Sequence, residues 1–289
     1  MIHVIVTAYN HEDFVGQCID RILSQRTSED FYVTVIDDAS TDGTPIIIQE
    51  LIQRSPIPIH LERSKHNYRN SLEHPVFKVM AQSPADFFAF CDGDDYWSDD
   101  FKLEKQLKLA HERPNIGLVH TNYSLLELGE NGSSLRSLSS TQISKAEQTH
   151  SAFDLIQGND IKHSTVLLRR EFLDLDFLDG SENIIPKDWL MYVDILSKSQ
   201  AAFINEVTTV HRVHKGGFWN GSLTKEKENM KDQVRWFCSS QLVEGELKNA
   251  FRNRVANDHL KSRISQSILY KSIRPLVLFL RTIRKRFRV

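Results

Sequence analysis

Three carboxylates crowd a single short turn of the chain. Asp92, Asp94 and Asp95 follow an apolar run that ends at Cys91, and Gly93 is the one other residue among them. Carboxylates so close repel one another, and a hard divalent cation such as Mg²⁺ or Mn²⁺ is the usual partner that links them to substrate phosphates. A solvated acidic turn is the alternative for an isolated motif of this kind. The prediction of a cation site therefore depends on other residues.

A second acidic turn follows another apolar run. Asp37 and Asp38 end the run that begins at Val35, and either side chain can accept hydrogen bonds from a base or a ribose. Asp42 or Thr41 can cap the helix that follows. Since Asp38 lies between the apolar run and the cap, we expect it to face a ligand.

Two later segments supply a candidate base and candidate cationic groups. Asp188 lies just inside the predicted start of a helix, where it either interacts with the helix dipole or acts on a substrate. Arg212 is a candidate phosphate partner. His214 is a candidate metal or diphosphate ligand, although a lone histidine is more often a surface or core residue.

Alternating strands and helices must position these residues. Short β-branched runs alternate with helical patterns over the first hundred residues, which is typical of βαβ units and a mostly parallel, doubly wound α/β sheet. We expect strands at Ile2–Thr7, Tyr32–Asp37, Ile57–Glu62 and Asp86–Cys91, and helices at Phe14–Ser24, Thr44–Gln53 and Leu72–Gln82. Ligands bind beyond the carboxyl ends of such strands, where residues 8–10, 38–42 and 92–95 fall.

The rest of the chain is less regular. We expect helices at Asp100–Glu112 and Trp189–Lys198, and strands at Ile116–Asn122 and Ser164–Arg169. A strand with its turn is expected at Ala202–His214, and an exposed loop at Gly129–His150. Only helical patterns follow from Thr224 onward. We therefore expect a catalytic domain over residues 1–222 and a helical region over residues 223–289.

In this order and spacing the motifs resemble the inverting glycosyltransferase family 2, whose members have the Rossmann-like, nucleotide-binding GT-A fold. The resemblance extends over residues 1–220. It is carried by Val-Thr-Ala-Tyr-Asn at 6–10, Asp-Asp-Ala-Ser-Thr-Asp-Gly-Thr at 37–44 and Asp-Gly-Asp at 92–94. It implies a nucleotide-sugar donor.

The resemblance gives the residues of the first three loops a role at the nucleotide. Three residues would frame the base: Thr7, Ala8 and Tyr9. The Tyr9 ring offers a stacking face, and Asp38 would accept a hydrogen bond from the uracil N–H, which favours a UDP donor. Arg69 would lie near the base or a phosphate, in a loop where Tyr68 replaces the family's glycine.

The resemblance also assigns the diphosphate side of the site. Asp94 and His214 would hold a divalent cation, Mn²⁺ or Mg²⁺, that bridges the diphosphate. Asp95 is either a further ligand or a support for the turn. Further donor contacts would come from Asp92, Gly93 and Arg212.

Asp188 would be the catalytic base, removing the proton from the acceptor hydroxyl in a single displacement with inversion. The implied activity is a metal-dependent glycosyltransferase of the hexosyltransferase type, acting on a saccharide or lipid-linked acceptor of a bacterial surface glycan such as capsule, lipopolysaccharide or exopolysaccharide. A sugar-phosphate nucleotidyltransferase is an alternative, but its glycine-rich signature with Arg and Lys is missing after the first strand. A non-catalytic, membrane-tethered nucleotide-sugar binding module is another, and retention of the four site aspartates argues against it.

Composition indicates an ordinary globular protein, with 40% hydrophobic and 26% charged residues. The sequence has no window of eighteen apolar residues, so we expect neither a signal peptide nor a spanning helix. Three cysteines that are far apart in the sequence, Cys18, Cys91 and Cys238, are typical of a reducing compartment. These features predict a cytoplasmic protein without a nucleic-acid partner and leave homo-oligomer formation open.

The C-terminal segment is electrostatically distinct. The formal net charge is -2, yet the segment from His259 to Val289 contains nine Lys or Arg and no acid. Its apolar residues recur every three or four positions, which predicts an amphipathic basic helix over residues 271–289. Such a helix either binds the anionic inner face of the cytoplasmic membrane, at about 1 kcal/mol per basic residue, or packs on the catalytic domain or a second subunit.

Overall fold

The computed structural model describes residues 1–67, 74–129, 132–138, 140–147, 150–178, 181, 187–214, 224–242 and 244–266. Arg69 and the tail helix predicted over residues 271–289 lie outside these ranges. The chain divides into two units, of which the first covers Met1–Val234 and the second begins at Arg235. The division falls within helix α9, Thr224–Gln241, whereas the predicted domain boundary precedes that helix.

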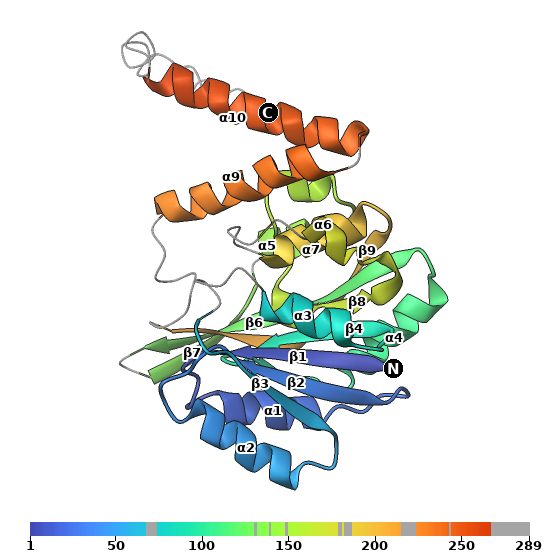
Figure 1. Ribbon diagram of the computed structural model, residues 1–289, viewed down its shortest axis with the longest axis vertical. Coiled ribbons are helices and arrows are strands. Elements are labelled where there is room, and N and C mark those ends of the chain that lie inside the picture. Colours follow the sequence, from blue (N-terminus) through green and yellow to red (C-terminus); the bar gives the residue numbers. More distant parts are fainter. Residues whose placement is uncertain are drawn as a thin grey trace. The chain divides into compact units, whose positions relative to one another are not determined.

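The first unit is built on one sheet with helices on both faces (Figure 1). In the described residues the strand order is β3-β2-β1-β4-β8-β6-β9-β5, and β7 pairs with β6. The strands are β1 Ile2–Ala8, β2 Phe31–Asp37, β3 Ile59–Arg63, β4 Phe87–Asp92, β5 Tyr96–Trp97, β6 Ile116–Gly129, β7 Gly132–Ser137, β8 Leu167–Arg169 and β9 Gln200–Val213.

Parallel pairing joins β3, β2, β1 and β4, which confirms the predicted α/β arrangement. The helices between these strands are α1 Val15–Leu23, α2 Thr44–Arg54 and α3 Pro75–Gln82. Figure 1 shows α1 and α2 on one face of the sheet and α3 on the other. Both faces of β1 and β2 are therefore covered, and continuous β-branched runs suit strands buried on both sides. Val4 and Val33 pack in one core with Ile19 and Ile48 of the helices.

Strand β3 begins two positions later than predicted. Ile57 lies between Pro56 and Pro58, and a proline has no N–H to donate to a ladder. The carbonyl of Pro58 still accepts a hydrogen bond from the N–H of Val33 at 3.0 Å, so regular pairing starts at Ile59.

The second half of the sheet is mixed. β8 runs antiparallel to both β4 and β6, whereas β6 and β9 run parallel. The helices here are α4 Lys102–Glu112, α5 Ser140–Glu147, α6 Leu175–Leu178 and α7 Lys187–Leu196, and short 3-10 turns cover Asp154–Ile156, His163–Thr165 and Arg170–Phe172.

The prediction of an exposed loop over Gly129–His150 is wrong for the described part of that stretch. β6 continues seven residues beyond the predicted end at Asn122, and β7 pairs with this extension from Ser124 to Gly129. The polar sequence of β7 gives no strand signal of its own, because its ladder partner is what makes it a strand. The predicted strand at Ser164–Arg169 is shorter as well, since a 3-10 turn occupies its first residues before β8.

The second unit is helical in the described residues. It contains the end of α9 and the helix α10, Glu246–Gln266. Arg235 and Arg254 both pair with Asp258, at 3.3 and 2.8 Å, and Phe251 is fully buried. The helical pattern predicted from Thr224 onward is therefore confirmed here. Among the helices that the structure describes, none is long and apolar enough to cross a membrane.

Candidate active site

The carboxyl ends of β1, β2 and β4 lie side by side. In the ladders, Ala8 pairs with Asp37 and Thr7 pairs with Asp92. The N–H of Gly93 donates to the Thr7 carbonyl at 2.8 Å, and the N–H of Asp38 donates to the Ala8 carbonyl at 2.8 Å. The sheet therefore brings together the three loops that the sequence placed at one edge.

The loop after β1 is fastened to the loop after β2. The N–H of Thr41 donates to the Asn10 side chain at 2.8 Å, and the N–H of Asn10 donates to Ser40 Oγ at 3.0 Å. Asn10 and Ala39 have φ angles of 55° and 63°, a left-handed conformation that costs a residue such as Ala39 free energy and is concentrated at functional sites. The loops at residues 8–10 and 38–42 are thus hydrogen-bonded to each other, and we call them together the ledge.

The three aspartates of the turn after β2 have different surroundings. Asp37 is buried and pairs with Arg63 at 3.0 Å. Asp42 accepts the N–H of Thr44, the first residue of α2, at 3.0 Å, but the N-cap of that helix is Gly43, so Asp42 is not the capping residue. Asp38 is also buried, next to the Ala8 carbonyl, whereas the Tyr9 side chain is 45% exposed. The ledge thus offers an open aromatic ring near a buried carboxyl.

Asp95 supports the acidic turn from beneath. Its side chain is fully buried and accepts four hydrogen bonds or ion pairs: from His211 Nδ1 at 2.8 Å, the Arg212 N–H at 3.0 Å, Ser164 Oγ at 2.7 Å and Lys162 Nζ at 3.2 Å. Burial alone would raise the pKa of Asp95, but Lys162 and His211 outweigh it and hold that pKa well below its usual range. Since both carboxylate oxygens are engaged, the structure favours the supporting role over that of a metal ligand.

Lys162 is a site residue that the sequence analysis missed. Its ammonium lies 3.4 Å from Asp92 Oδ2 and 3.2 Å from Asp95 Oδ2. Burial lowers the pKa of Lys162, but the charges of the three aspartates of the turn outweigh burial and raise it above the ordinary value. Lys162 belongs to no motif, and its one sequence signal is its position before Ser164, which also reaches Asp95. It is a permanent positive charge inside the acidic cluster.

Replacing Lys162 with Met should lower the free energy of unfolding by about 3–5 kcal/mol, because Asp95 would remain buried without its main counter-ion. Adding Asp95→Asn removes the uncompensated charge, so the double variant should be more stable than the sum of the two single effects. Urea unfolding of the wild type, both single variants and the double variant measures this coupling. Additive effects of the two substitutions would contradict the counter-ion role.

Asp94 contacts two imidazoles, and its side chain is 15% exposed, compared with 31% for Asp92. Asp94 Oδ2 lies 3.1 Å from His214 Nε2 and 3.8 Å from His11 Nε2. Burial would raise the pKa of Asp94, but the hydrogen bond from His214 and the charge of His11 lower it overall, so the group is an anion near neutral pH. The structure thus joins Asp94 to His214, as predicted, and adds His11.

Arg212 reaches the turn from β9. Its guanidinium donates to the backbone carbonyl of Asp94 at 2.6 Å and also to Gln17. It lies over the rings of Phe14 and Tyr96, 5.0 and 4.6 Å from their centroids. Arg212 therefore fixes the backbone of the acidic turn, and its contact with a donor phosphate stays a prediction.

The residues of the turn fit a divalent cation. One ligand atom each from Asp92, Asp94 and Asp95 lies within 4.8 Å of the others. Lys162 pairs with Asp92 and Asp95, whereas Arg212 binds the backbone of the turn, so the three carboxylates outnumber the lysine that pairs with them. Because Asp95 is saturated, Asp94 with His214 is the place where a cation would be held. Carboxylate and imidazole are ordinary ligands of Mn²⁺.

Asp188 lies in the first turn of α7, as predicted. Its Oδ2 accepts a hydrogen bond from Asn159 Nδ2 at 3.3 Å. Burial raises the pKa of Asp188 and the charge of Asp92 raises it further, whereas His163 and the N–H of Trp189 act in the opposite direction. A carboxyl with a raised pKa, electrostatically coupled to the acidic turn, has the properties of a general base.

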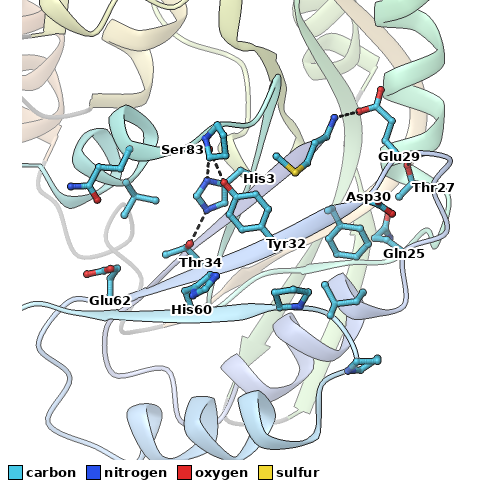
Figure 2. A pocket seen from close by; sticks show the side chains of 18 residues that line it. His3, Gln25, Thr27, Glu29, Asp30, Tyr32, Thr34, His60, Glu62 and Ser83 are labelled. Atoms are coloured by element: carbon cyan, nitrogen blue, oxygen red, sulfur yellow. Dashed lines mark hydrogen bonds and ion pairs between the residues drawn. The ribbon is translucent and has the colours of Figure 1, made fainter.

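A separate hollow of about 890 Å³ lies at the opposite, amino ends of β1 to β3 (Figure 2). The His3 ring forms hydrogen bonds with Ser83 at 3.0 Å and Thr34 at 2.7 Å, and the Tyr32 hydroxyl forms one with Ser83 at 2.8 Å (Figure 2). Burial, with a smaller effect of His60, lowers the pKa of His3 to about 4, so the ring is neutral at pH 7. These polar groups satisfy one another, and ligands of α/β sheets bind at the other end of the strands. The hollow is therefore not the active-site candidate.

An α/β fold with acids at the carboxyl edge of a mainly parallel sheet is the class that these features define, and the chain belongs to glycosyl transferase family 2. The profile of that family, Glycosyl transferase family 2, matches residues 3–175, more than half of the chain. The resemblance inferred from the motifs is thereby confirmed.

Two curated relatives illustrate the similarity. An uncharacterized protein of Mycobacterium tuberculosis is 30% identical over 255 residues, which cover 88% of this chain and 70% of that protein. A Bacillus subtilis protein, TuaG, whose name assigns it provisionally as a teichuronic acid biosynthesis glycosyltransferase, is 31% identical over 126 residues. That match covers 44% of this chain and 48% of TuaG.

Solved structures share the GT-A fold with this chain. The S. aureus TarS structure in complex with UDP-GlcNAc has a TM-score of 0.63 at 15% identity and covers 92% of this chain and 73% of that chain. Mannosyltransferase PcManGT from Pyrobaculum calidifontis, solved with GDP-Man and Mn²⁺, has a TM-score of 0.62 at 16% identity and covers 96% of this chain and 79% of that chain. The predicted fold is confirmed.

Proposed function

We propose that the protein is an inverting glycosyltransferase that transfers a sugar from a UDP-sugar, with a divalent cation, to a saccharide or lipid-linked acceptor. The proposal is carried by the acidic turn at the carboxyl edge of the sheet, together with Asp188, whose pKa is raised by burial and by the charge of Asp92. The turn offers a cluster of three carboxylates for a cation, and Asp188 offers a base with a raised pKa. One cation and one base are what a single displacement at a nucleotide sugar requires.

The donor would lie along the ledge formed by the first two loops. The exposed ring of Tyr9 would stack on the base, framed by Thr7 and Ala8, and Asp38 would accept the uracil N–H. The complexes of TarS with UDP-GlcNAc and of PcManGT with GDP-Man support a nucleotide-sugar donor. Arg69 would complete the base or phosphate contacts from the loop after β3.

Different residues would act on the departing diphosphate and on the acceptor hydroxyl. Asp94 and His214 would hold the cation, which supplies Lewis-acid stabilisation of the departing diphosphate when bound. Arg212 and Lys162 keep the turn in place. Asp188, oriented by Asn159, would take the proton from the acceptor hydroxyl as that oxygen attacks the sugar carbon.

The acceptor would belong to a bacterial surface glycan. The name of TuaG places that relative in teichuronic acid biosynthesis, which supports a glycan acceptor. The basic tail predicted over residues 271–289 would hold the enzyme at the inner face of the cytoplasmic membrane, where a lipid-linked acceptor is found. The protein would thus be a cytoplasmic, peripheral membrane enzyme.

A thermal-shift screen of nucleotide sugars, with and without Mn²⁺, tests the donor. A UDP-sugar with Mn²⁺ should stabilise the protein by about 2.7 kcal/mol at one hundred times its Kd, which corresponds to a shift of several degrees in Tm. GDP-sugars should stabilise less, because Asp38 would face the wrong base edge. If no nucleotide sugar raises Tm under either condition, the proposed function is wrong.

A further inference from the structure

The segment that precedes β8 contacts both the acidic turn and the helix of the candidate base. On the side of the turn, Lys162 Nζ lies 3.4 Å from Asp92 Oδ2, and Ser164 Oγ accepts the N–H of Asp92 at 3.1 Å. On the side of the helix, Asn159 Nδ2 donates to Asp188 Oδ2 at 3.3 Å. One short stretch of chain therefore connects the acids of the donor side with the group that would act on the acceptor.

His163 gives this segment a second contact with α7. Its Nδ1 lies 2.7 Å from the Tyr192 hydroxyl, and its ring stacks on Phe90, with centroids 4.4 Å apart and 28° between the ring planes. Tyr192 is 0% exposed and Phe90 is 1% exposed, so the imidazole is held by two buried side chains. Phe90 belongs to β4, the strand that ends at Asp92, and Tyr192 belongs to the helix that carries Asp188. His163 therefore joins the strand that leads into the acidic turn to the helix of the candidate base.

Tyr192 lies on the same face of α7 as Asp188. The two residues are four positions apart in a regular helix, and side chains at that spacing lie one above the other. A contact at Tyr192 therefore fixes the rotation of α7 about its axis, and with it the direction of the Asp188 carboxylate. The hydrogen bond from Asn159 at 3.3 Å is long, so the shorter contact of His163 with Tyr192 is the firmer of the two links to α7.

The hydrogen bond between His163 and Tyr192 joins two neutral groups. Burial raises the pKa of Tyr192 well above its ordinary value, so the hydroxyl keeps its proton. Burial also lowers the pKa of His163, although the charges of Asp92 and Asp188 act in the opposite direction, and the ring is neutral at pH 7. A buried O–H that donates to no acceptor is costly, and His163 Nδ1 is its hydrogen-bond partner in the described part of the chain. Tyr192 therefore donates, and His163 accepts at Nδ1 and carries its own proton on Nε2.

We propose that His163 and Tyr192 are positioning residues for the Asp188 base, because their hydrogen bond sets the place of α7 relative to the acidic turn. The proposal rests on the proposed function, in which Asp188 takes the proton of the acceptor hydroxyl. A displacement of about 1 Å in a reacting group can lower a rate by about a hundredfold. The nucleotide would bind on the ledge, which contains neither residue, so the pair should act on the transfer step and not on donor binding.

Tyr192→Phe tests the pair, because it removes the hydroxyl and keeps the buried ring. The kcat of sugar transfer should fall at least about tenfold, while KM for the UDP-sugar and its thermal shift with Mn²⁺ should change by less than about twofold. In the Asp188→Asn background the same substitution should change kcat by less than about twofold, since no carboxylate base is left to position. His163→Leu should resemble Tyr192→Phe. His163→Asn should recover part of the rate, because its side-chain carbonyl can accept the hydroxyl in place of Nδ1.

Tyr32→Phe is the matched control, since it removes a hydroxyl that is hydrogen-bonded to Ser83 at 2.8 Å at the other end of the strands, and it should leave kcat unchanged. Melting temperatures verify that each variant is folded, and if Tyr192→Phe does not fold, the two His163 variants give the same comparison. An equal loss of kcat from Tyr192→Phe with and without Asp188 would overturn the proposal. If Asp188→Asn loses activity while Tyr192→Phe and His163→Leu keep it, this inference alone fails; if Asp188→Asn also keeps it, the base of the proposed function fails.

Discussion

Asn in place of Asp94 should lower the rate of sugar transfer by about a thousandfold or more. The substitution removes the negative charge that would hold the cation, and Lewis-acid stabilisation of a leaving group contributes several kcal/mol. About 1.4 kcal/mol corresponds to a factor of ten in rate. Asn keeps the size of the side chain, and Arg212 still binds the backbone carbonyl at this position. Release of UDP from a UDP-sugar with Mn²⁺, with and without acceptor, measures the loss.

The control for Asp94→Asn needs an exposed aspartate. Asp20 is suitable, because its side chain is 56% exposed and pairs only at the surface with Arg54. Asp99 is a poor control, since it accepts Lys105 at 2.6 Å and the N–H of Phe101 at 2.9 Å. Asp20→Asn should retain full activity. If Asp94→Asn transferred sugar at the wild-type rate, the proposed reaction would not depend on a cation held by Asp94.

The sequence was sufficient for the parallel half of the fold. The apolar runs of β1, β2 and β4 are mostly buried, and runs of this kind can be predicted as strands from composition. The loops that follow them must then meet at one edge, which is why the neighbours Thr7, Asp38 and Asp92 could be grouped before any coordinates. Hydrophobic periodicity and the topology rules of parallel sheets can therefore be applied to a single sequence.

The antiparallel half depends on contacts that sequence does not display. β7 is a strand because the extended β6 offers it a ladder, and its own polar residues carry no such pattern. Lys162 is similar at the level of the site. It lies 67 residues beyond Asp95 in the chain, and nothing in the residues around it indicates that its ammonium compensates the buried Asp95 and the partly exposed Asp92. Long-range pairing of charges became visible only in the folded chain.

The roles within the acidic turn also changed between sequence and structure. Adjacent carboxylates look alike in the sequence, yet Asp95 is saturated by protein donors while Asp94 contacts two imidazoles. Their different surroundings, rather than their spacing, separate a support from a candidate ligand. The position of Asp188 in the first turn of a helix, in contrast, was predicted from the sequence, because the start of a helix is a local feature; its role as a base stays a prediction.

Replacing Asp188 with Asn should lower the rate of transfer by about 10²–10⁴-fold while leaving donor binding unchanged, since a base acts on the acceptor and not on the nucleotide. Steady-state kinetics and the thermal shift given by a UDP-sugar with Mn²⁺ separate these two effects. Loss of the donor's thermal shift would instead place Asp188 in the donor site. Glu112→Gln, an exposed acid at the end of α4, serves as the control and should not change the rate.

The pH dependence of wild type and Asp188→Asn distinguishes a base from a cap. Burial raises the pKa of Asp188, so the rate should fall as pH decreases through a value above the ordinary pKa of an aspartate, about 3.9, and the Asn variant should lose this limb. The stability effect has the opposite sign. Because the folded state holds the Asp188 proton more tightly than the unfolded state, ionisation destabilises the fold as pH rises through the folded pKa. Asp188→Asn should therefore melt higher than the wild type at pH 7, with a difference that shrinks at acidic pH, whereas a helix-capping carboxylate would make the variant melt lower.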